Sequence, residues 1–95
     1  MDKDTLKEKL KENSDLQLID IRESFEHQNG YISEINIPLS EMMSRINEFD
    51  TNQEIILYCN SGRRSKALKY MISKTYSINT IDHLEGGYQA WIESN

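Results

Sequence analysis

The sequence predicts an α/β fold in which a mainly parallel sheet is covered by helices on both faces. Short apolar segments of strand length alternate with segments whose apolar residues recur at helical spacing. The most apolar segment, 54–58, is followed directly by a small polar loop and then by a helical pattern. The chain shows no internal repeat and no linker, and its Gly and Pro residues together number five. Strands that alternate with helices in this way are typical of parallel sheets.

In the first half of the chain, apolar periodicity and local stop signals define each element. The predicted elements are a helix over 4–12, a strand over 16–21, a short helix over 24–29 and a short strand over 35–38. Asp4 or Thr5 caps the first helix, and Glu8 completes a capping box with Thr5. Gly30 ends the second helix, and Pro38 denies the second strand further ladder hydrogen bonds.

The second half of the chain continues the alternation. The predicted elements are a helix over 40–49, a strand over 54–58, a helix over about 62–74, a strand over 80–84 and a closing helix marked by Tyr88, Trp91 and Ile92. The helix over 40–49 is expected to bury Met42, Met43, Ile46 and Phe49. The helix over about 62–74 is expected to bury Ala67, Leu68, Met71 and Ile72. Ser40 caps the helix over 40–49, and Gly86-Gly87 ends the strand over 80–84.

Length and composition predict one compact domain over residues 1–95, because a chain of this size buries roughly two-thirds of its unfolded surface. No apolar run approaches the roughly 18 residues that would span a bilayer, so no membrane partner is expected. The single cysteine excludes an internal disulfide, and a reducing cytoplasm is the expected location.

The charges are unevenly distributed along the chain. The net charge of −5 argues against nucleic acid as a partner. Residues 61–75 nevertheless carry five basic side chains and no acidic one, while the rest of the chain holds six basic and sixteen acidic residues. A basic segment directly after the cysteine suits a small anionic substrate or an acidic protein patch. A solvated helix face is the alternative interpretation.

The cysteine lies where the most apolar strand ends and the next helix begins. The residues that follow Cys59 are Asn60, Ser61, Gly62, Arg63, Arg64 and Ser65. Such a loop surrounds the thiol with backbone N–H groups at a helix N-terminus, which stabilises a thiolate and binds an anion. Gly62 lets the backbone curl so that these N–H groups converge. Asp20 also ends a predicted strand, so it is expected at the same edge of the sheet as Cys59.

The order Cys-x-x-Gly-x-Arg-Ser after a buried strand resembles the active-site loop of the rhodanese family of single-domain sulfurtransferases. Three further segments resemble that family: 18–23 with Phe25-Glu26, 30–32 running to 35–38, and 84–87 ending near Trp91. The resemblance implies a three-layer α/β/α fold with a central, mainly parallel five-stranded sheet whose first strand is short or missing. Tyr31 stands where the family usually has His, and the connection from Gly30 to Pro38 is one residue shorter.

The same resemblance implies a sulfurtransferase that works through a persulfide on Cys59. Cys59 attacks the outer sulfur of a small anionic donor such as thiosulfate, sulfite leaves, and the loop over 60–65 holds the persulfide. A thiol, a protein cysteine or, in an assay, cyanide then takes the sulfur, and no metal or organic cofactor is required. Arg64 is expected to fix the loop shape or the anionic part of the donor, and Arg63 to point to solvent or substrate. Ser65 hydrogen-bonds within the loop or caps the helix.

Other functions of the same fold remain as alternatives. A persulfide carrier or a non-catalytic interaction module would use this loop with protein partners. Rhodanese-like phosphatases and arsenate reductases have five residues between Cys and Arg, whereas four residues separate Cys59 from Arg64. The shorter ring suits one sulfur atom better than a tetrahedral phosphate or arsenate, so sulfur chemistry is favoured.

Four polar residues outside the loop carry side chains that catalytic or metal sites often use. Asp20 and Arg22 can pair and brace the edge of the sheet near the loop, or take part in catalysis. His27 and His83 share no spacing with Cys59, and they are expected to be solvated or core residues. No metal site is predicted.

Overall fold

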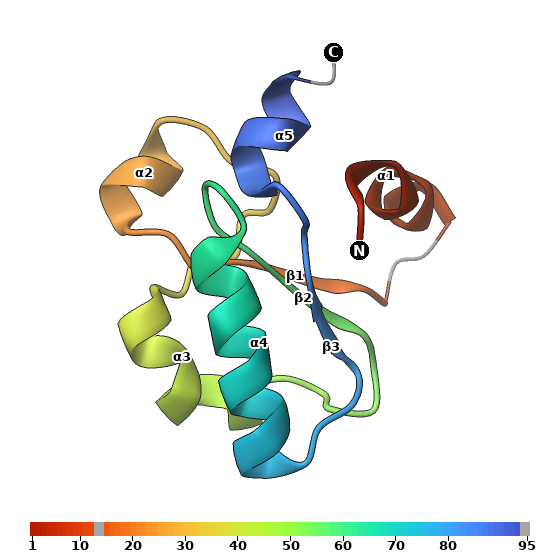
Figure 1. The fold of residues 1–95 in the computed structure, drawn as a ribbon, viewed down its shortest axis with the longest axis vertical. Helices are drawn as coiled ribbons and strands as arrows, with labels where there is room; N and C mark the ends of the chain where they lie inside the picture. The colour runs from red at the N-terminus through yellow and green to blue at the C-terminus, as the bar shows by residue number, and fades with distance from the viewer. Residues whose placement is uncertain (13–14, 94–95) are drawn as a thin grey trace.

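A parallel three-stranded sheet forms the centre of the computed structural model, which describes residues 1–12 and 15–93. Its strands are β1 (Gln17–Asp20), β2 (Ile55–Tyr58) and β3 (Ile81–His83), in the order β1-β2-β3 (Figure 1). β2 pairs in parallel with both neighbours, and Asp20 lies opposite Tyr58. The carboxyl ends of the strands therefore meet at one edge, which confirms that Asp20 and Cys59 share it.

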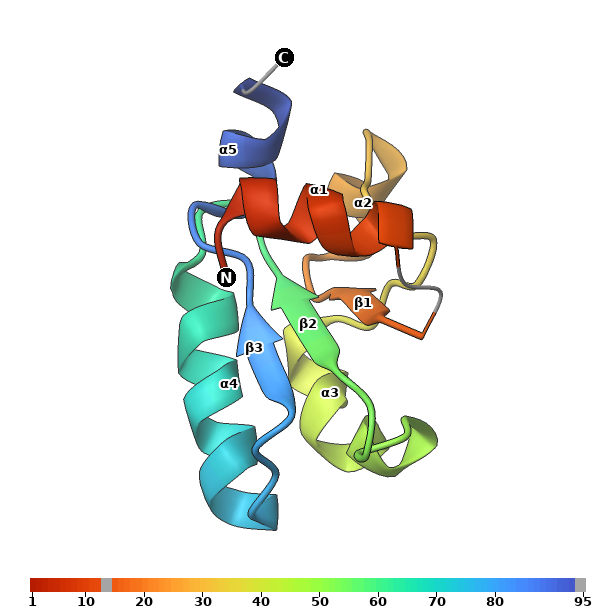
Figure 2. The ribbon, with the colours of Figure 1, turned by 90° about the vertical axis from the view of Figure 1, so that its right-hand side faces the viewer.

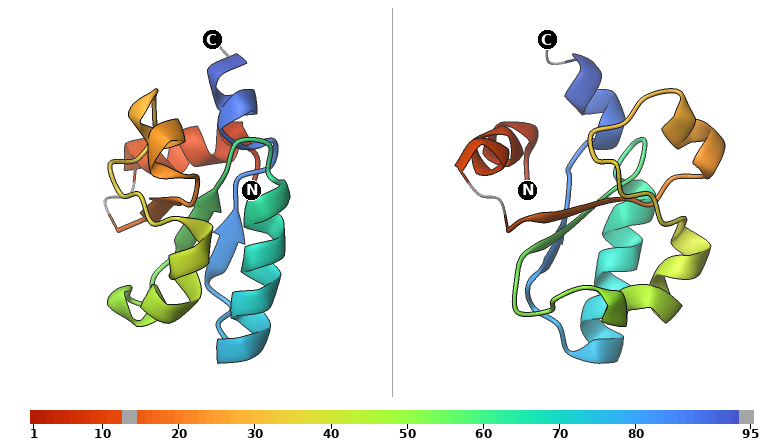
Figure 3. Two further views of the ribbon diagram at one scale, coloured as in Figure 1. Left: turned by 90° about the vertical axis from the view of Figure 1, so that its left-hand side faces the viewer. Right: turned by 180° about the vertical axis from the view of Figure 1, so that it is seen from behind.

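Helices cover both faces of this sheet, as predicted for an α/β fold. One face carries α3 (Leu39–Arg45), the 3-10 helix η1 (Ile46–Glu48) and α4 (Arg63–Tyr76), and the other carries α1 (Lys3–Glu12) and α5 (Gly87–Glu93) (Figures 1 and 2). α2 (Ser24–Gln28) lies beyond the carboxyl ends of the strands, at the same end of the molecule as α5 (Figure 3). No helix in the described part of the chain has the length and apolar character to cross a membrane.

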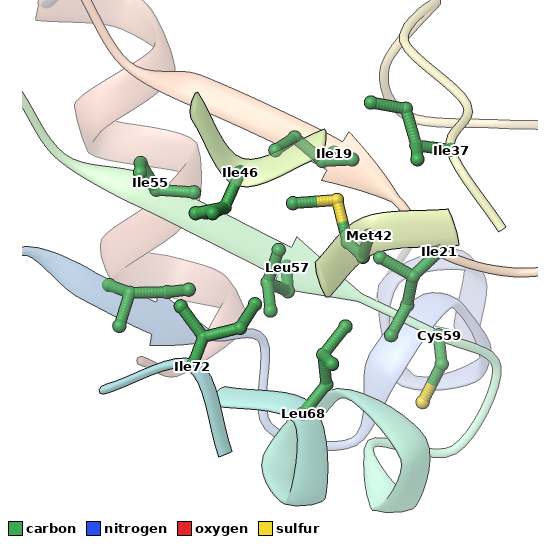
Figure 4. Packing of buried hydrophobic residues seen from close by; sticks show 11 residues of the cluster. Ile19, Ile21, Ile37, Met42, Ile46, Ile55, Leu57, Cys59, Leu68 and Ile72 are labelled. Atoms are coloured by element: carbon green, nitrogen blue, oxygen red, sulfur yellow. The ribbon is translucent and has the colours of Figure 1, made fainter. Parts of the chain in front are cut away.

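β2 is buried on both faces, because its successive side chains point to opposite sides of the sheet and helices cover each side. Ile55 and Leu57 of β2 join an apolar cluster with side chains of α3 and α4 (Figure 4). Ile56 and Tyr58 join a second cluster with side chains of α1 and α5. Cys59 continues the first set and is fully buried. Its thiol thus lies at the end of the larger core cluster that is nearest to the loop after β2 (Figure 4).

The expected five-stranded sheet is wrong in its strand count, because the described residues contain a sheet of three strands. The segment over 35–38 was expected to be a strand, but it forms a single isolated bridge between Asn36 and Asp20. Pro38 lacks the N–H that a longer ladder would need. The first strand was expected to be short or missing, and the described residues contain none before α1, which begins at Lys3.

Two helices begin earlier than predicted, and their caps differ accordingly. The carboxylate of Asp2 accepts the N–H of Thr5 at 2.8 Å, so the cap of α1 is Asp2 rather than Asp4 or Thr5. The predicted capping box of Thr5 and Glu8 is therefore wrong. α3 begins at Leu39, which places Ser40 inside its first turn instead of at its cap.

α4 buries only part of the face that was predicted to be inward. Leu68 and Ile72 are buried in the core, but Ala67 is exposed and Met71 is 51% exposed. Leu68 and Ile72 pack against the sheet, whereas the flanking side chains of Ala67 and Met71 remain at the surface. In the preceding helical segment, the predicted inward residues pack on the core: Met42, Met43, Ile46 and Phe49.

Candidate active site

The loop after β2 folds around the side chain of Cys59. Gly62 has φ 98°, in the left-handed region that favours glycine, and it turns the chain into α4. The sulfur of Cys59 accepts the N–H of Gly62 at 3.1 Å and the N–H of Ser65 at 3.4 Å. The hydroxyl oxygen of Ser65 lies 3.5 Å from the same sulfur. The thiol therefore faces two backbone N–H donors and the Ser65 hydroxyl, which donates to the Gly62 carbonyl at 3.2 Å, at the start of a long helix.

The first turn of α5 holds the outer side of this loop. The N–H of Tyr88 donates to the Cys59 carbonyl at 2.8 Å, and the N–H of Gln89 donates to the Asn60 carbonyl at 3.0 Å. Gly87 permits this approach, because a Cβ there would lie 2.5 Å from the Cys59 carbonyl oxygen. Since these carbonyls are bound on the α5 side, the loop presents N–H groups to the sulfur.

Two opposing effects act on the thiol of Cys59. Burial raises its pKa, because a buried thiolate loses solvation. The hydroxyl of Ser65 and the N–H groups of Ser65, Gly62 and Arg64 lower it, because they stabilise the negative sulfur. The hydrogen bonds together outweigh burial, so the pKa of Cys59 lies below its ordinary value. The loop thus favours the nucleophilic form of the sulfur.

We expect the thiolate of Cys59 to form with a midpoint below that of an ordinary cysteine, in the direction in which the loop shifts its pKa. Because the pKa is lowered, the reactive form accumulates at a lower pH than in an unfolded chain. Thiolate ultraviolet absorbance against pH, with Cys59→Ser as the blank, measures this midpoint, and the alkylation rate against pH is a second readout. Ser65→Ala removes the hydroxyl but keeps the N–H, so its midpoint should be higher. An unshifted wild-type midpoint would contradict the loop geometry.

Arg64 and Arg63 have different surroundings. The guanidinium of Arg64 donates to both carboxylate oxygens of Glu26 on α2, each at 3.2 Å. Arg64 also interacts electrostatically with Cys59. Burial raises the pKa of Glu26, but the hydrogen bonds from Arg64 and Glu23 outweigh it and leave that pKa below its ordinary value. Arg63 is exposed and forms no ion pair within the described part of the chain.

A buried ion pair lies at the end of β1, one strand away from the loop. The guanidinium of Arg22 binds both carboxylate oxygens of Asp20, with the shortest distance 2.7 Å. Asp20 is 0% exposed and Arg22 is 3% exposed. Arg22 also donates to the Gly30 carbonyl at 2.6 Å and lies 4.3 Å from the ring centre of Tyr88. The pair therefore ties β1 to the segment after α2 and to α5.

Tyr58 and His27 complete this polar network. The hydroxyl of Tyr58 donates to Asp20 at 3.1 Å and accepts the N–H of Ile32 at 3.0 Å. Burial raises the pKa of Tyr58 to about 12, so the phenol stays protonated. Nδ1 of His27 lies 2.9 Å from Asp20, and the ring of His27 stacks on Tyr31. The residue directly before Cys59 is thus fixed by buried hydrogen bonds.

The chain matches the family model of the Rhodanese-like domain over residues 2–94. It belongs to the rhodanese-like domain family. A solved rhodanese-related protein from Thermoplasma volcanium is 31% identical, with a TM-score of 0.86, and the match covers 100% of this chain and 91% of that one. The family assignment made from the Cys59 loop and its flanking segments is therefore confirmed.

Three relatives show what this rhodanese-like chain resembles in sequence. A sulfurtransferase from Allochromatium vinosum is 30% identical over 93 residues, which cover 96% of this chain and 85% of that protein. In Bacillus subtilis, the uncharacterized protein YqhL is 38% identical over 76 residues and the putative sulfur carrier protein YrkF is 38% identical over 64 residues. These matches cover 79% and 66% of this chain, but only 60% and 35% of the two Bacillus proteins.

The rhodanese-like fold brings the predicted site residues together in two groups. Cys59, Gly62, Arg64 and Ser65 surround the sulfur, whereas Asn60, Ser61 and Arg63 have exposed side chains. Asp20 and Arg22 form the predicted pair, which reaches the loop through Tyr58, the residue directly before Cys59. No group of three metal-binding side chains is found in residues 1–12 and 15–93.

Sequence reasoning missed three residues around this rhodanese-like site. Glu26 reaches Arg64, and His27 and Tyr58 bind the carboxylate of Asp20. The spacing of Glu23 and Glu26 indicates the capping box of α2, which their reciprocal side-chain and backbone bonds form, but it does not indicate the contact of Glu26 with Arg64. A phenol inside an apolar strand was a usable signal, because a buried tyrosine hydroxyl needs a partner.

Proposed function

We propose that this rhodanese-like protein is a sulfurtransferase that carries a sulfane sulfur as a persulfide on Cys59. The observation that carries the proposal is the pair of N–H groups, from Gly62 and Ser65, that point at the buried sulfur at 3.1 and 3.4 Å. The relative from Allochromatium vinosum, named a sulfurtransferase, supports the same chemistry. A reactive thiol of this kind needs a reducing compartment, and the cytoplasm is the proposed location.

In the first half-reaction, the thiolate of Cys59 attacks the outer sulfur of thiosulfate. A new S–S bond forms to Cys59, the S–S bond of the donor breaks, and its electron pair leaves with sulfite. The negative charge moves from Cys59 onto the added sulfur. The same N–H groups that stabilise the thiolate face this growing charge, since they are fixed by α4 and α5.

In the second half-reaction, a thiophilic acceptor attacks the outer sulfur of the persulfide. Cyanide yields thiocyanate in an assay, and a thiol or a protein cysteine is the proposed acceptor otherwise. The bond to Cys59 breaks and its electron pair restores the thiolate. The protein therefore needs no external reductant to complete a turnover.

The size of the ring around the sulfur argues against phosphoryl chemistry. Four residues separate Cys59 from Arg64, and Arg64 is already bound to Glu26 on α2. A tetrahedral phosphate or arsenate would need more donors than the N–H groups of Gly62 and Ser65. Release of phosphate from an aryl phosphate at a rate comparable to sulfur transfer would count against this choice.

Intact mass measurement tests the proposal directly. After exposure to thiosulfate and removal of excess donor, the protein should gain the mass of one sulfur atom, and peptide mapping should place it on Cys59. Addition of cyanide should remove that mass and release thiocyanate. If no donor of sulfane sulfur, including an organic persulfide, adds mass to Cys59, the proposed function is wrong and the domain is a non-catalytic interaction module.

A persulfide carrier is the second candidate, and the name of the relative YrkF, a putative sulfur carrier protein, favours it. The carrier differs in kinetics rather than in chemistry. Slow loading by thiosulfate together with rapid loading by a desulfurase and a stable persulfide would select it. Fast turnover with thiosulfate and cyanide would select the enzyme.

Glu26→Gln is expected to lower the apparent KM for thiosulfate about threefold, because it releases Arg64 from a half-exposed ion pair worth about 0.2–1 kcal/mol. Glutamine keeps an oxygen that can accept the Glu23 N–H, so the cap of α2 is retained. Steady-state rates against thiosulfate concentration measure the change. Glu48→Gln, which breaks the exposed pair with Arg45 away from the site, is the matched control and should leave KM unchanged. A raised KM in Glu26→Gln would show that Glu26 instead positions Arg64 for the donor.

A further inference from the structure

An apolar groove begins beside the Cys59 loop and runs between α3 and α4, which lie side by side (Figure 1). It has a volume of about 380 Å³ and is lined by Leu39, Met43, Arg63, Arg64, Ala67, Leu68 and Met71. We refer to these residues as the α3–α4 groove. A second hollow adjoins it along α4 and adds Lys66 and Tyr70 to the lining. The groove thus leads from the candidate active site along the surface of α4.

Large exposed apolar side chains line the α3–α4 groove and the hollow that adjoins it. Tyr70 is 61% exposed, Met71 is 51% exposed and Leu39 is 36% exposed. Thiosulfate has no apolar atoms and does not need such a surface. Apolar side chains gathered on a small protein are typical of a site that binds another molecule with apolar groups. This surface therefore suits a ligand that is larger and less polar than the sulfur donor.

The charges at the rim indicate that this ligand is acidic. Arg64 pairs with Glu26, whereas Arg63 and Lys66 form no ion pair with any residue in the described part of the chain. Segment 61–75 holds five basic residues and no acidic one. Unpaired cations beside an apolar surface favour a partner that supplies carboxylates and apolar side chains together.

We propose that the α3–α4 groove docks the protein that accepts sulfur from Cys59, through an acidic segment with an apolar side chain next to its reactive cysteine. The inference rests on the proposed function. Arg64 connects the two places, because it lines the groove and interacts with Cys59. An apolar side chain in the groove would hold the partner's cysteine beside the loop.

The transfer step balances without a further reagent. The thiolate of the partner attacks the outer sulfur of the Cys59 persulfide, and a new S–S bond forms on the partner. The S–S bond to Cys59 breaks, and its electron pair remains on Cys59 as the thiolate. The outer sulfur keeps the negative charge that it carried on Cys59, so the partner leaves as a persulfide anion.

Two synthetic cysteine peptides test the docking proposal on the full chain loaded with sulfur by thiosulfate. In one peptide the cysteine is flanked by leucine and glutamate residues, and in the other lysine replaces glutamate. The rate of sulfur transfer, followed by mass, should be about tenfold higher for the acidic peptide, and this preference should weaken as salt is added. Lys66→Glu and Met71→Glu should each remove most of the preference while cyanide turnover stays unchanged. Lys11→Glu, an equal charge change on α1 across the sheet, should have no effect.

Each other outcome has a definite meaning. Equal rates for the two peptides, with normal loading and normal cyanide turnover, would overturn the docking proposal and leave the proposed function intact. Failure to load Cys59 with any donor would overturn both. Self-association of the wild type that Met71→Glu abolishes would assign the groove to a second copy of this chain, and would also overturn the proposal.

Discussion

Cys59→Ser is expected to lower thiocyanate formation from thiosulfate and cyanide by about a thousandfold or more, as for removal of other catalytic nucleophiles. Serine keeps a buried polar atom near the N–H groups of Gly62 and Ser65. Its hydroxyl does not ionise near neutral pH, however, and it cannot form a persulfide. Initial rates of thiocyanate release and intact mass after thiosulfate treatment measure the two parts of this prediction.

The side chain of Cys59 belongs to the larger core cluster, so the experiment must also show that Cys59→Ser is folded. Its circular dichroism and unfolding midpoint should stay close to those of the wild type, since serine is similar in size to cysteine. Ser65→Ala offers a milder comparison that keeps the nucleophile and should retain part of the rate. Normal turnover or a sulfur adduct in Cys59→Ser would rule out the proposed mechanism.

The architecture could be predicted from the sequence because the strands carry strong local signals. The apolar run before Cys59 and the helical spacing after it place β2 and α4 within two residues of their observed bounds. The strand count could not be predicted in the same way. Segment 35–38 has the apolar character of a strand, but whether it pairs depends on how the chain returns past Asp20 after α2. That return is a long-range arrangement with no periodic signal.

The candidate site shows the same division between local and long-range information. The loop from Cys59 to Ser65 could be predicted because its contacts are local: Gly62 turns the chain, and α4 begins at the next residue. The contact of Glu26 with Arg64 joins residues on separate helices, and spacing alone does not reveal it. Met71 shows the opposite case, because its helical spacing predicts burial while the sheet has room only for the neighbouring ridge of α4.

Asp20→Ala is expected to lower the free energy of unfolding by about 3–5 kcal/mol, the usual cost of removing one partner of a buried ion pair. The substitution leaves Arg22, which is 3% exposed, without its counter-charge. It also removes the hydrogen-bond partner of Tyr58 and the contact with His27. The loss is a large share of the roughly 5–15 kcal/mol that stabilises a small domain. Denaturant unfolding measures it, and Arg22→Leu added to Asp20→Ala should recover part of the loss.

The pH dependence of this effect follows from the pKa of Asp20. Burial raises that pKa, but the hydrogen bonds from Arg22 and His27 outweigh it, and the pKa lies below its ordinary value of 3.8. The ionised carboxylate therefore stabilises the folded state fully above that value, and its contribution is lost as pH falls through the folded pKa. The difference in stability between wild type and Asp20→Ala should be largest near neutral pH and should shrink in acid. A constant difference across this range would show that Asp20 acts through packing rather than through its charge.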